Sequence, residues 1–356
     1  MNFVHIADMH FDAPFTSLSG LDNMGDIRRL EQRKIFKKVI DFIKENEIGY
    51  LFISGDLYEH EYVRLSTIEY INNLFKEIPN TKIFISPGNH DPYIKGSYYD
   101  TFKFADNVHI FKGGIERVET EDANIYGMGF NSFSMSNSEI SQFILPISYK
   151  PNVFVVHCDL NGGKDKNGIE YNPVTEARLK LFNFDYIAMG HIHKTNYRKD
   201  KTIIYSGSPI SFGFDELGEH GMVVGQLEKG RLESAFIKLD EREFVEFELN
   251  IEGVLSKEDL VEKISELELE ENKMYKIILV GSRNFEIDTR EILRLVSLKN
   301  VLKIKDETFL NYDLEAIAKE NNIKGIFVRE AMQMLEKGKY SEKEIMRAIE
   351  IGLEVM

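Results

Sequence analysis

The chain has 356 residues, with 44 basic and 59 acidic side chains, a formal net charge of −15 and 43% hydrophobic residues. This composition is that of a folded globular protein and excludes a disordered or fibrous chain. The lone cysteine, Cys158, excludes a disulfide framework and a thiol-rich metal site. The length favours a catalytic domain of ordinary size with one or two smaller pieces.

Charge and hydropathy also restrict the compartment and the partners. The chain contains no run of about 18 apolar residues that would span a membrane, and residues 1–8 lack the basic start and long apolar core of a signal peptide. We therefore expect a soluble, cytoplasmic protein with no membrane contact. Residues 1–240 carry 26 basic and 33 acidic side chains, a net charge of −7. This acidity disfavours nucleic-acid binding, unless bound cations offset part of it.

Strands and helices alternate from residue 2 to about residue 238. The predicted helices are Asp26–Glu45 and Ser66–Lys76, and the predicted strands are Phe3–Ala7, Tyr50–Ile53, Lys82–Ser86, Val108–Phe111, Ala123–Gly127, Val153–Val156 and Tyr186–Met189. Apolar central strands separated by helices indicate a largely parallel sheet covered on both faces. The stretches 202–206, 222–228 and 231–238 leave little room for helices, which predicts an antiparallel closing segment. The implied architecture is two packed sheets flanked by helices.

The pattern changes near residue 240. Apolar and polar residues alternate over 245–252, which is typical of a half-buried strand. A helix that begins after Ser256 and two further strands follow, so residues 241–310 are predicted to form a small α+β domain. Residues 311–356 are helical by pattern, and Ser341 with Glu344 predicts a capping box. These terminal helices either pack on their own domain or dock a partner.

Residues that can bind a metal follow five of the predicted strands. They are Asp8 and His10 after the first strand, Asp56 after the second, Asn89, His90 and Asp91 after the third, His157, and finally His191 and His193. Loops at strand ends hold functional groups on a rigid base. A single Asp in such a loop is usually a turn or cap former. Five strand ends of this kind in one chain predict a shared metal centre.

Hydrolysis of a phosphate ester is the chemistry that such a centre suits. Two divalent cations about 3.5–4 Å apart neutralise a phosphoryl group and generate hydroxide at neutral pH. The expected ligands are Asp8, His10, Asp56, Asn89, His157, His191 and His193. A carboxylate such as that of Asp56 can bridge both cations. Carboxylate and imidazole ligands without a thiolate favour manganese, iron or zinc over magnesium or calcium.

The motifs also resemble a known family. The series Asp8-Met9-His10, Gly55-Asp56, Gly88-Asn89-His90-Asp91, His157 and Gly190-His191-Ile192-His193 is similar, in order and spacing, to that of the calcineurin-like metallophosphoesterase superfamily. The opening HIADMHFDAPFTSLSG resembles that of bacterial YhaO-type relatives of the SbcD DNA repair nucleases. The segment GHIHKTNYRKDKTIIYSGSPISFGFDELGEHGMVV resembles the SbcD pattern. The resemblance covers about residues 1–240 and weakens beyond them.

This resemblance implies a four-layer α/β/β/α sandwich with a small α+β capping domain and C-terminal helices. It implies one metal held by Asp8, His10, Asp56 and His193, and a second held by Asp56, Asn89, His157 and His191. His90 would stabilise the phosphate or protonate the leaving oxygen. Asp91 either orients His90 or caps its loop.

The chain departs from the family pattern at Glu59, where relatives often have His or Asp. Its carboxylate keeps the support that an Asp would give to the metal ligands. A role specific to His is not expected there, and His60 is left unassigned.

Three functions follow as hypotheses. The first is a manganese-dependent nuclease that cleaves DNA phosphodiesters in repair with an SMC-like ATPase of the SbcC or YhaN type; the resemblance also allows a homodimer. The second is a phosphodiesterase or phosphatase for small molecules or phosphoproteins, which the net acidity favours. The third is a non-catalytic regulatory subunit of an ATPase. The basic residues Lys194, Arg198, Lys199 and Lys201 could grip a phosphate backbone or form a solvated loop.

Overall fold

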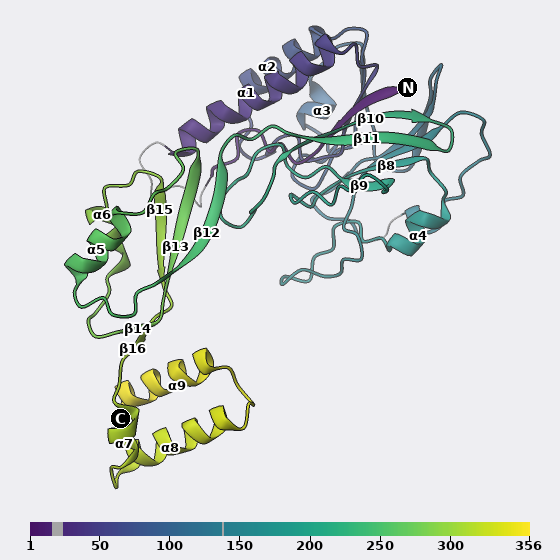
Figure 1. Cartoon of the computed structure of the whole chain (residues 1–356). Coiled ribbons are helices and arrows are strands. Elements are labelled where there is room, and N and C mark those ends of the chain that lie inside the picture. The colour runs from purple at the N-terminus through teal and green to yellow at the C-terminus, as the bar shows by residue number, and fades with distance from the viewer. Residues whose placement is uncertain (16–23, 137–138) are drawn as a thin grey trace. The chain divides into compact units, whose positions relative to one another are not determined.

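The computed structural model describes residues 1–15, 24–136 and 139–356. These residues form two compact units, Met1–Glu243 and Phe244–Met356, which are considered separately. The chain can be followed from purple to yellow in Figure 1. Residues 16–20, the end of the opening stretch that resembles YhaO-type proteins, lie outside the described residues.

The first sheet of the first unit has six strands among the described residues, in the order β11-β10-β1-β2-β3-β4. Their bounds are β11 (Arg231–Lys238), β10 (Gly221–Glu228), β1 (Asn2–Ile6), β2 (Tyr50–Ile53), β3 (Lys82–Ile85) and β4 (Val108–Ile110). The strands β1 to β4 run parallel. The strand β10 pairs antiparallel with β1, and β11 pairs antiparallel with β10. The antiparallel pair therefore closes one edge of an otherwise parallel sheet.

The second sheet has the order β5-β6-β7-β8-β9 within the described part of the chain. Its strands are β5 (Glu116–Glu119), β6 (Asn124–Met128), β7 (Asn152–His157), β8 (Tyr186–Gly190) and β9 (Ile203–Tyr205). The strands β6 to β9 run parallel, whereas β5 is antiparallel to β6. The prediction of an antiparallel closing segment is right for β10 and β11 and wrong for β9. The connection from β8 to β9 is long enough for a crossover without a helix.

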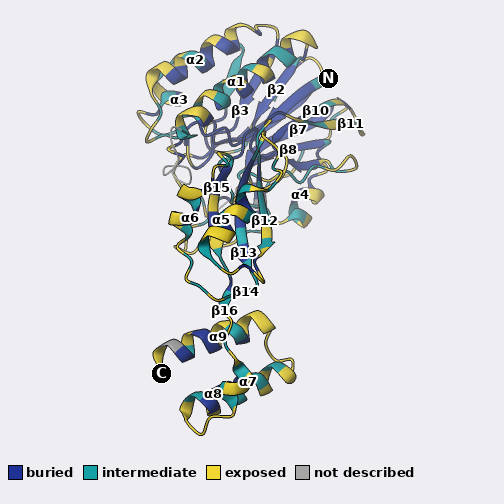
Figure 2. Cartoon of the chain, turned by 60° about the vertical axis from the view of Figure 1, so that its left-hand side comes forward, coloured by how far each residue is buried: buried dark blue, intermediate teal, exposed yellow. Residues whose placement is uncertain are grey.

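The two sheets pack face to face through buried aromatic and branched side chains. Because side chains alternate along a strand, Phe3 of β1 points to the second sheet while Val4 points to the helices. The Phe3 ring lies 4.6 Å from that of Tyr186, centroid to centroid. Figure 2 shows the central strands of both sheets, such as β2, β3, β7 and β8, in dark blue and the outer turns of α1 and α2 in yellow. The predicted packed sheets are confirmed.

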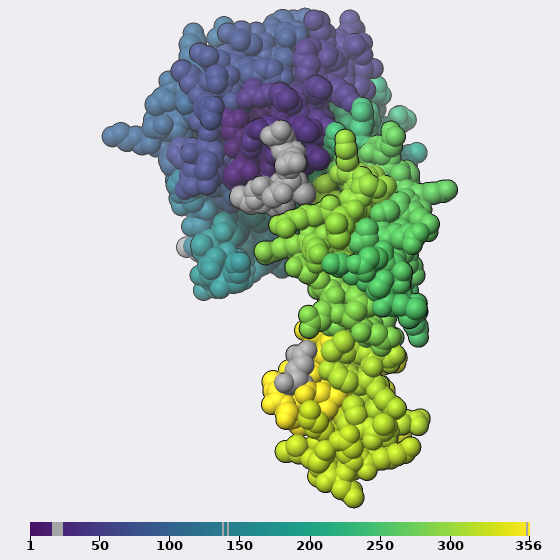
Figure 3. Space-filling model, turned by 90° about the vertical axis from the view of Figure 1, so that its left-hand side faces the viewer, coloured from purple at the N-terminus to yellow at the C-terminus, as the bar shows by residue number. Residues whose placement is uncertain are grey.

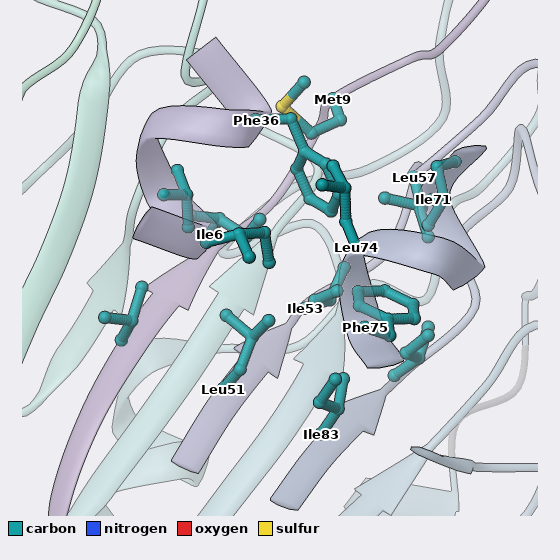
Figure 4. Packing of buried hydrophobic residues seen from close by; sticks show 14 of the residues in the cluster. Ile6, Met9, Phe36, Leu51, Ile53, Leu57, Ile71, Leu74, Phe75 and Ile83 are labelled. Carbon is teal, nitrogen blue, oxygen red and sulfur yellow. The ribbon is translucent and has the colours of Figure 1, made fainter. Parts of the chain in front are cut away.

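Helices cover the outer face of the first sheet. The helices α1 (Met24–Glu45) and α2 (Leu65–Lys76) bury apolar residues against β1, β2 and β3. The short helix α3 (Tyr98–Thr101) adds Tyr99 to the same cluster, whereas the short helix α4 (Glu176–Leu181) packs in another one. Phe36 of α1 and Phe75 of α2 meet Leu51 and Ile83 of the sheet in Figure 4. A cluster on the outer face of the second sheet includes Leu179 of α4. The result is the α/β/β/α layering that the sequence predicts.

The second unit combines a sheet with helices. It holds β12 (Glu243–Asn250), β13 (Lys273–Val280), β15 (Val301–Asp306) and the small pair β14 (Ser282–Arg283) and β16 (Phe309–Leu310), with α5 (Lys257–Ser265), α6 (Thr289–Leu295), α7 (Leu314–Ala318), α8 (Ile323–Glu336) and α9 (Glu342–Val355). Leu260 of α5 and Ile292 of α6 pack on the β12-β13-β15 sheet. The capping box of Ser341 and Glu344 is confirmed at the start of α9.

The helices α8 and α9 pair through a small apolar cluster centred on Val328 and Ile349. Figure 3 shows surface atoms of α8 in yellow-green and of α9 in yellow. A bond from Arg283 of β14 to Glu350, 3.0 Å long, ties α9 to the strand pair. Among the described helices, none combines the length and the apolar character needed to cross a membrane.

Candidate metal centre

Five loops meet at one edge of the first unit. They follow β1, β2, β3, β7 and β8, which are parallel strands within their own sheets, so their carboxyl ends point the same way. Backbone bonds tie the first two loops together: the N–H of Asp8 donates to Gly55 O at 3.0 Å, and that of His10 donates to Asp56 O at 2.8 Å. The predicted convergence of the strand ends is therefore present in the fold.

Four of the candidate residues have a left-handed backbone. The φ angles are 53° at Asp8, 46° at His10, 51° at Asp56 and 108° at His191. Residues other than glycine rarely adopt such φ angles, and backbone strain of this kind concentrates at functional sites. The strain is offset by the bonds between the loops, which turn these side chains toward one another.

A close approach of backbone explains one glycine of the motifs. A Cβ atom placed on Gly88 would lie 2.2 Å from Oδ1 of Asp56. Any larger residue at this position would push the β3 loop away from Asp56. The same carboxyl oxygen accepts the backbone N–H of His90 at 2.9 Å.

Asp56 lies at the middle of the cluster and is 2% exposed. Its Oδ2 atom is 3.5 Å from Nε2 of His10 and 3.3 Å from Nε2 of His157. One carboxylate oxygen thus lies between imidazoles that come from two different sheets. Three sets of side chains, which share members, bring their ligand atoms within 4.8 Å of one another: Asp8, His10 and His193; His10, Asp56 and His90; and Asp8, Asp56 and His157.

The protonation of His157 follows from its partners. Its Nδ1 lies 2.9 Å from Ser54 O, and because a carbonyl oxygen only accepts, Nδ1 carries the proton and donates. In the neutral ring, Nε2 then carries a lone pair and no proton. It faces the carboxamide oxygen of Asn89 at 3.0 Å and the Asp56 carboxylate at 3.3 Å. Three acceptors converge, and a cation between them is what would stabilise this arrangement.

His10 and His193 repeat the pattern. Nδ1 of His10 lies 2.7 Å from the Glu59 carboxylate, and Nδ1 of His193 lies 2.5 Å from that of Glu216. Carboxylates accept these protons, so both Nε2 atoms present lone pairs, and they are 3.1 Å apart. A metal-bound histidine normally donates its other N–H in this way. The donor set therefore fits divalent cations.

The pKa values of the cluster in the metal-free chain also indicate that it favours bound positive charge. Burial raises the pKa of the Asp8 carboxyl. Burial also acts to raise the pKa of Asp56, but His157 and His10 outweigh it and hold that pKa well below its usual value. Burial lowers the pKa of His157 and Asp56 raises it, with a net rise to about 9. In the metal-free chain, protons on groups such as His157 supply the positive charge that balances the buried carboxylates. Metal binding would release these protons.

His191 lies at the border of the cluster. Its backbone N–H donates to Oδ1 of Asp8 at 2.9 Å, and its ring lies 5.1 Å from that of His157, centroid to centroid. Its ring nitrogens belong to none of the three close groups that the described residues form. The structure therefore brings six of the seven expected ligands into direct proximity and places His191 beside His157.

His90 is the most solvent-accessible member, with its side chain 46% exposed. Its Nδ1 lies 2.9 Å from Oε2 of Glu59, while Oε1 of the same carboxylate accepts from His10. Burial lowers the pKa of His90, and the bond to Glu59 raises it, to a net value of about 9. The Glu59 carboxylate therefore bonds both His10, an expected metal ligand, and His90, the expected proton donor.

Asp91 is completely buried and holds loops together. Its carboxylate accepts the backbone N–H groups of Asp56, Leu57 and Gly88. It also accepts the hydroxyl of Tyr99 at 2.7 Å. The bonds between described residues include none from Asp91 to the His90 ring. They favour the loop-capping alternative over an orienting or catalytic role for Asp91.

Glu216 is the contact that sequence reasoning missed. It lies 23 residues beyond His193 and within the stretch that resembles SbcD, but no spacing rule connects it to a histidine so far back in the chain. Two further histidines, His5 and His220, are buried and bonded outside the cluster. His5 bonds Tyr186 and Ser54 in the core, and His220 bonds Ser208.

A family model described as calcineurin-like phosphoesterase matches residues 1–195, which include all five loops. The chain belongs to the calcineurin-like phosphoesterase family. Proteins of this family are metal-dependent phosphoester hydrolases. The resemblance stated from the motifs is thereby confirmed.

A curated relative supports the narrower label. The chain is similar to a protein of Bacillus subtilis (strain 168) named as the uncharacterized metallophosphoesterase YhaO, with 23% identity over 247 residues. The match covers 66% of this chain. The chain spans about 60% of the length of the curated relative that it matches.

Proposed function

We propose that the chain hydrolyses phosphodiesters with a pair of divalent cations and that its substrate is DNA. The observation that carries the proposal is the position of Asp56 Oδ2, between the Nε2 atoms of His10 and His157 at 3.5 and 3.3 Å. Each of these rings has its Nδ1 bonded outward, to Glu59 and Ser54 respectively. A bridging carboxylate with imidazoles on either side is the arrangement that a two-metal hydrolase requires.

Two sets of residues would hold the cations. The first set is Asp8, His10, Asp56 and His193, and the second is Asp56, Asn89, His157 and His191. Bound there, the cations would neutralise phosphoryl oxygens and lower the pKa of a water molecule. Manganese is the proposed metal, with iron or zinc as alternatives, because the set mixes carboxylate, carboxamide and imidazole without thiolate.

His90 is proposed to act on the leaving group. Its Nδ1 bonds Glu59, which fixes the ring and directs the other edge away from that carboxylate. The side chain is 46% exposed, so a substrate can reach it. An imidazole in this position can donate a proton to the departing alkoxide.

DNA as the substrate rests on the SbcD-like stretches and on the similarity to YhaO. The test is incubation of the purified chain with Mn²⁺ and labelled duplex or hairpin DNA, with Asp56→Asn as the matched inactive control. We expect Mn²⁺-dependent cleavage that the variant lacks. If neither the chain alone nor the chain with an ATPase partner cleaves DNA, the substrate assignment is wrong.

A phosphatase or phosphodiesterase for smaller substrates is the second candidate. The net charge of −15 favours it, because phosphate contacts to DNA come from basic side chains. Hydrolysis of bis-p-nitrophenyl phosphate would occur under either proposal. Competition by DNA at low salt separates them, since a DNA enzyme is inhibited and a small-molecule enzyme is not.

An SMC-like ATPase of the SbcC or YhaN type is the proposed partner, and the hairpin of α8 and α9 is its proposed docking element. Exposed apolar side chains on these helices support this, among them Ile326 at 55% and Ile351 at 48%. Titration of the chain against the ATPase should show binding that Ile326→Asp with Ile351→Asp abolishes. Unchanged binding would remove the hairpin from the interface.

A non-catalytic regulatory role makes the opposite prediction for the site. His90→Asn and Asp56→Ala would both leave repair in cells untouched if the chain served only as a scaffold. The catalytic proposal predicts loss of repair with both changes while the ATPase still co-purifies with the chain.

A further inference from the structure

The helix α1 carries two buried polar side chains one turn apart. Arg28 is 0% exposed and Gln32 is 1% exposed, and they continue the same face as the apolar residues Ile35, Phe36 and Val39. Burial of a charged or amide group is costly unless it is hydrogen-bonded. Both side chains are bonded, and their partners lead to the metal centre from two directions.

Gln32 supports the loop that carries His10. Its Nε2 group donates to the carbonyl oxygen of Met9 and to that of His10, the latter at 3.1 Å. These carbonyls belong to the stretch in which His10 has a φ of 46°. The amide therefore holds in place a backbone that would otherwise relax.

Arg28 reaches a second loop through a buried ion pair. Its Nη1 and Nη2 atoms donate to the two oxygens of Asp240 at 3.2 and 2.6 Å. Nη2 also donates to Ser211 O at 2.7 Å, and Oδ2 of Asp240 accepts the backbone N–H of Ser211 at 2.9 Å. The pair thus binds both backbone polar groups of a single residue.

Ser211 begins the loop that carries Glu216. Its hydroxyl donates to Glu216 O at 3.1 Å, and Oε2 of Glu216 accepts the backbone N–H of Phe212 at 3.0 Å. The other oxygen, Oε1, accepts from Nδ1 of His193 at 2.5 Å. An unbroken series of bonds runs from Arg28 to His193.

We propose that Arg28 and Asp240, together with Gln32, are positioning residues that set His193 against His10. The two histidines come from different sheets, and their Nε2 atoms are 3.1 Å apart. Gln32 bonds the loop of His10, and Arg28 bonds the loop whose Glu216 contacts His193. One helix therefore helps to hold both histidines in position. The inference rests on the proposed function only in taking these histidines as ligands of one metal.

Stability alone does not account for the ion pair. Replacing a buried ion pair by apolar residues of similar volume is often neutral or stabilising, whereas removing one partner is strongly destabilising. A pair that only filled the core could be exchanged for apolar residues without consequence at the metal centre. A pair that positions Ser211 could not.

The test is the paired substitution Arg28→Met with Asp240→Leu in the full chain. The melting temperature without metal should fall, because buried Ser211 loses the partners of both its backbone polar groups, so the titration is carried out well below that temperature. Mn²⁺ titration by calorimetry should show one of the two sites weakened by about tenfold, the lower end for residues that orient metal ligands, and the other unchanged. The matched control is Arg283→Met with Glu350→Leu, an ion pair of the second unit with a bond of 3.0 Å between a partly buried arginine and a buried glutamate, which should leave both affinities unchanged.

Unchanged Mn²⁺ affinity in a folded Arg28→Met/Asp240→Leu protein would overturn the inference. If that protein does not fold, two single variants take its place. Asp240→Asn keeps an oxygen beside the buried Arg28 side chain, and Glu216→Ala changes a residue that lies nearer the surface. Each should weaken the same site, and Glu216→Gln, which keeps an acceptor for His193, should restore most of the affinity lost in Glu216→Ala. Equal affinities in all three would contradict the proposal.

The proposed function fails separately. A chain that binds Mn²⁺ but hydrolyses no phosphodiester would contradict that function, while a selective loss of affinity in the Arg28 variant would still support the positioning role.

Discussion

At the scale of single residues, the metal centre is defined by the direction in which each imidazole donates. His10, His157 and His193 all donate from Nδ1 to an oxygen outside the cluster, and all turn Nε2 inward. Asp56 then supplies a carboxylate oxygen between two of these Nε2 atoms. Charge and lone-pair direction together make the centre a cation site.

Replacement of Asp56 by Asn tests the bridging carboxylate. The change keeps the shape but removes the charge that two cations would share. We expect Mn²⁺ affinity to fall by at least about 100-fold, the upper end for residues outside the ligand set, with loss of hydrolysis. Calorimetric titration measures the affinity, and the exposed Asp41→Asn serves as the control. Equal affinities for the two variants would contradict a bridging role.

Glu59 offers a second test, because both of its oxygens accept. Oε1 accepts from His10 and Oε2 from His90, whereas a glutamine at this place has one oxygen and one NH₂ group. Glu59→Gln therefore leaves one histidine without an acceptor. We expect turnover to fall by about 10- to 100-fold, measured with bis-p-nitrophenyl phosphate. Turnover equal to that of the unsubstituted chain would mean that Glu59 is dispensable.

At the scale of elements, the strand ends are where the sequence is most informative. Short apolar runs followed by Asp8, Asp56, Asn89, His157 and His191 predict strands that end at a common site, because parallel strands place their carboxyl ends together. The fold confirms these strands and brings the loops together. Local pattern suffices here, since each strand and the residues after it lie within a few positions of one another.

The features that sequence misses depend on distant partners. The stretch 202–206 is predicted as part of an antiparallel segment, but β9 pairs parallel with β8, and this direction is set by a crossover rather than by its own residues. The strand β5 is polar, and among the described residues it pairs with β6 alone. Arg28 belongs to a helix with many charged residues, so its burial against Asp240, 212 positions away, leaves no local signal. The same applies to Glu216.

His5 links the two sheets and gives a pH-dependent prediction. It lies on β1, and its ring bonds Tyr186 of β8 at 2.8 Å and Ser54 at 3.1 Å. Burial lowers its pKa to about 3, below the value of about 6.5 in an unfolded chain. The unfolded state therefore binds the proton more readily. The contribution is present above pH 6.5 and is lost as the pH falls toward 3.

Denaturant unfolding of the metal-free chain measures this contribution. His5→Asn should reduce the loss of stability between pH 6.5 and 4 by about 3 kcal/mol relative to the unsubstituted chain. The control is His109→Asn, which replaces a histidine at a half-buried position near Glu116. Identical slopes for the His5 variant and the unsubstituted chain would show that His5 titrates normally in the fold.

At the scale of the whole molecule, charge and metal binding are linked. The chain has a net charge of −15, and the centre buries Asp8 and Asp56 together. Bound divalent cations stabilise the folded state by mass action, by about 2.7 kcal/mol per site at 100 times Kd. Chelation of both sites should therefore remove about 5.4 kcal/mol and lower the melting temperature of the first unit by about 10–20 °C. A melting temperature that chelation leaves unchanged would argue against two occupied sites.

The central claim is a pair of cations bridged by Asp56. Anomalous diffraction from crystals soaked in Mn²⁺ tests it most directly. We expect two peaks about 3.5–4 Å apart, with Asp56 between them, His10 and His193 at one and Asn89 and His157 at the other. A single peak, or peaks that Asp56 does not touch, would contradict it.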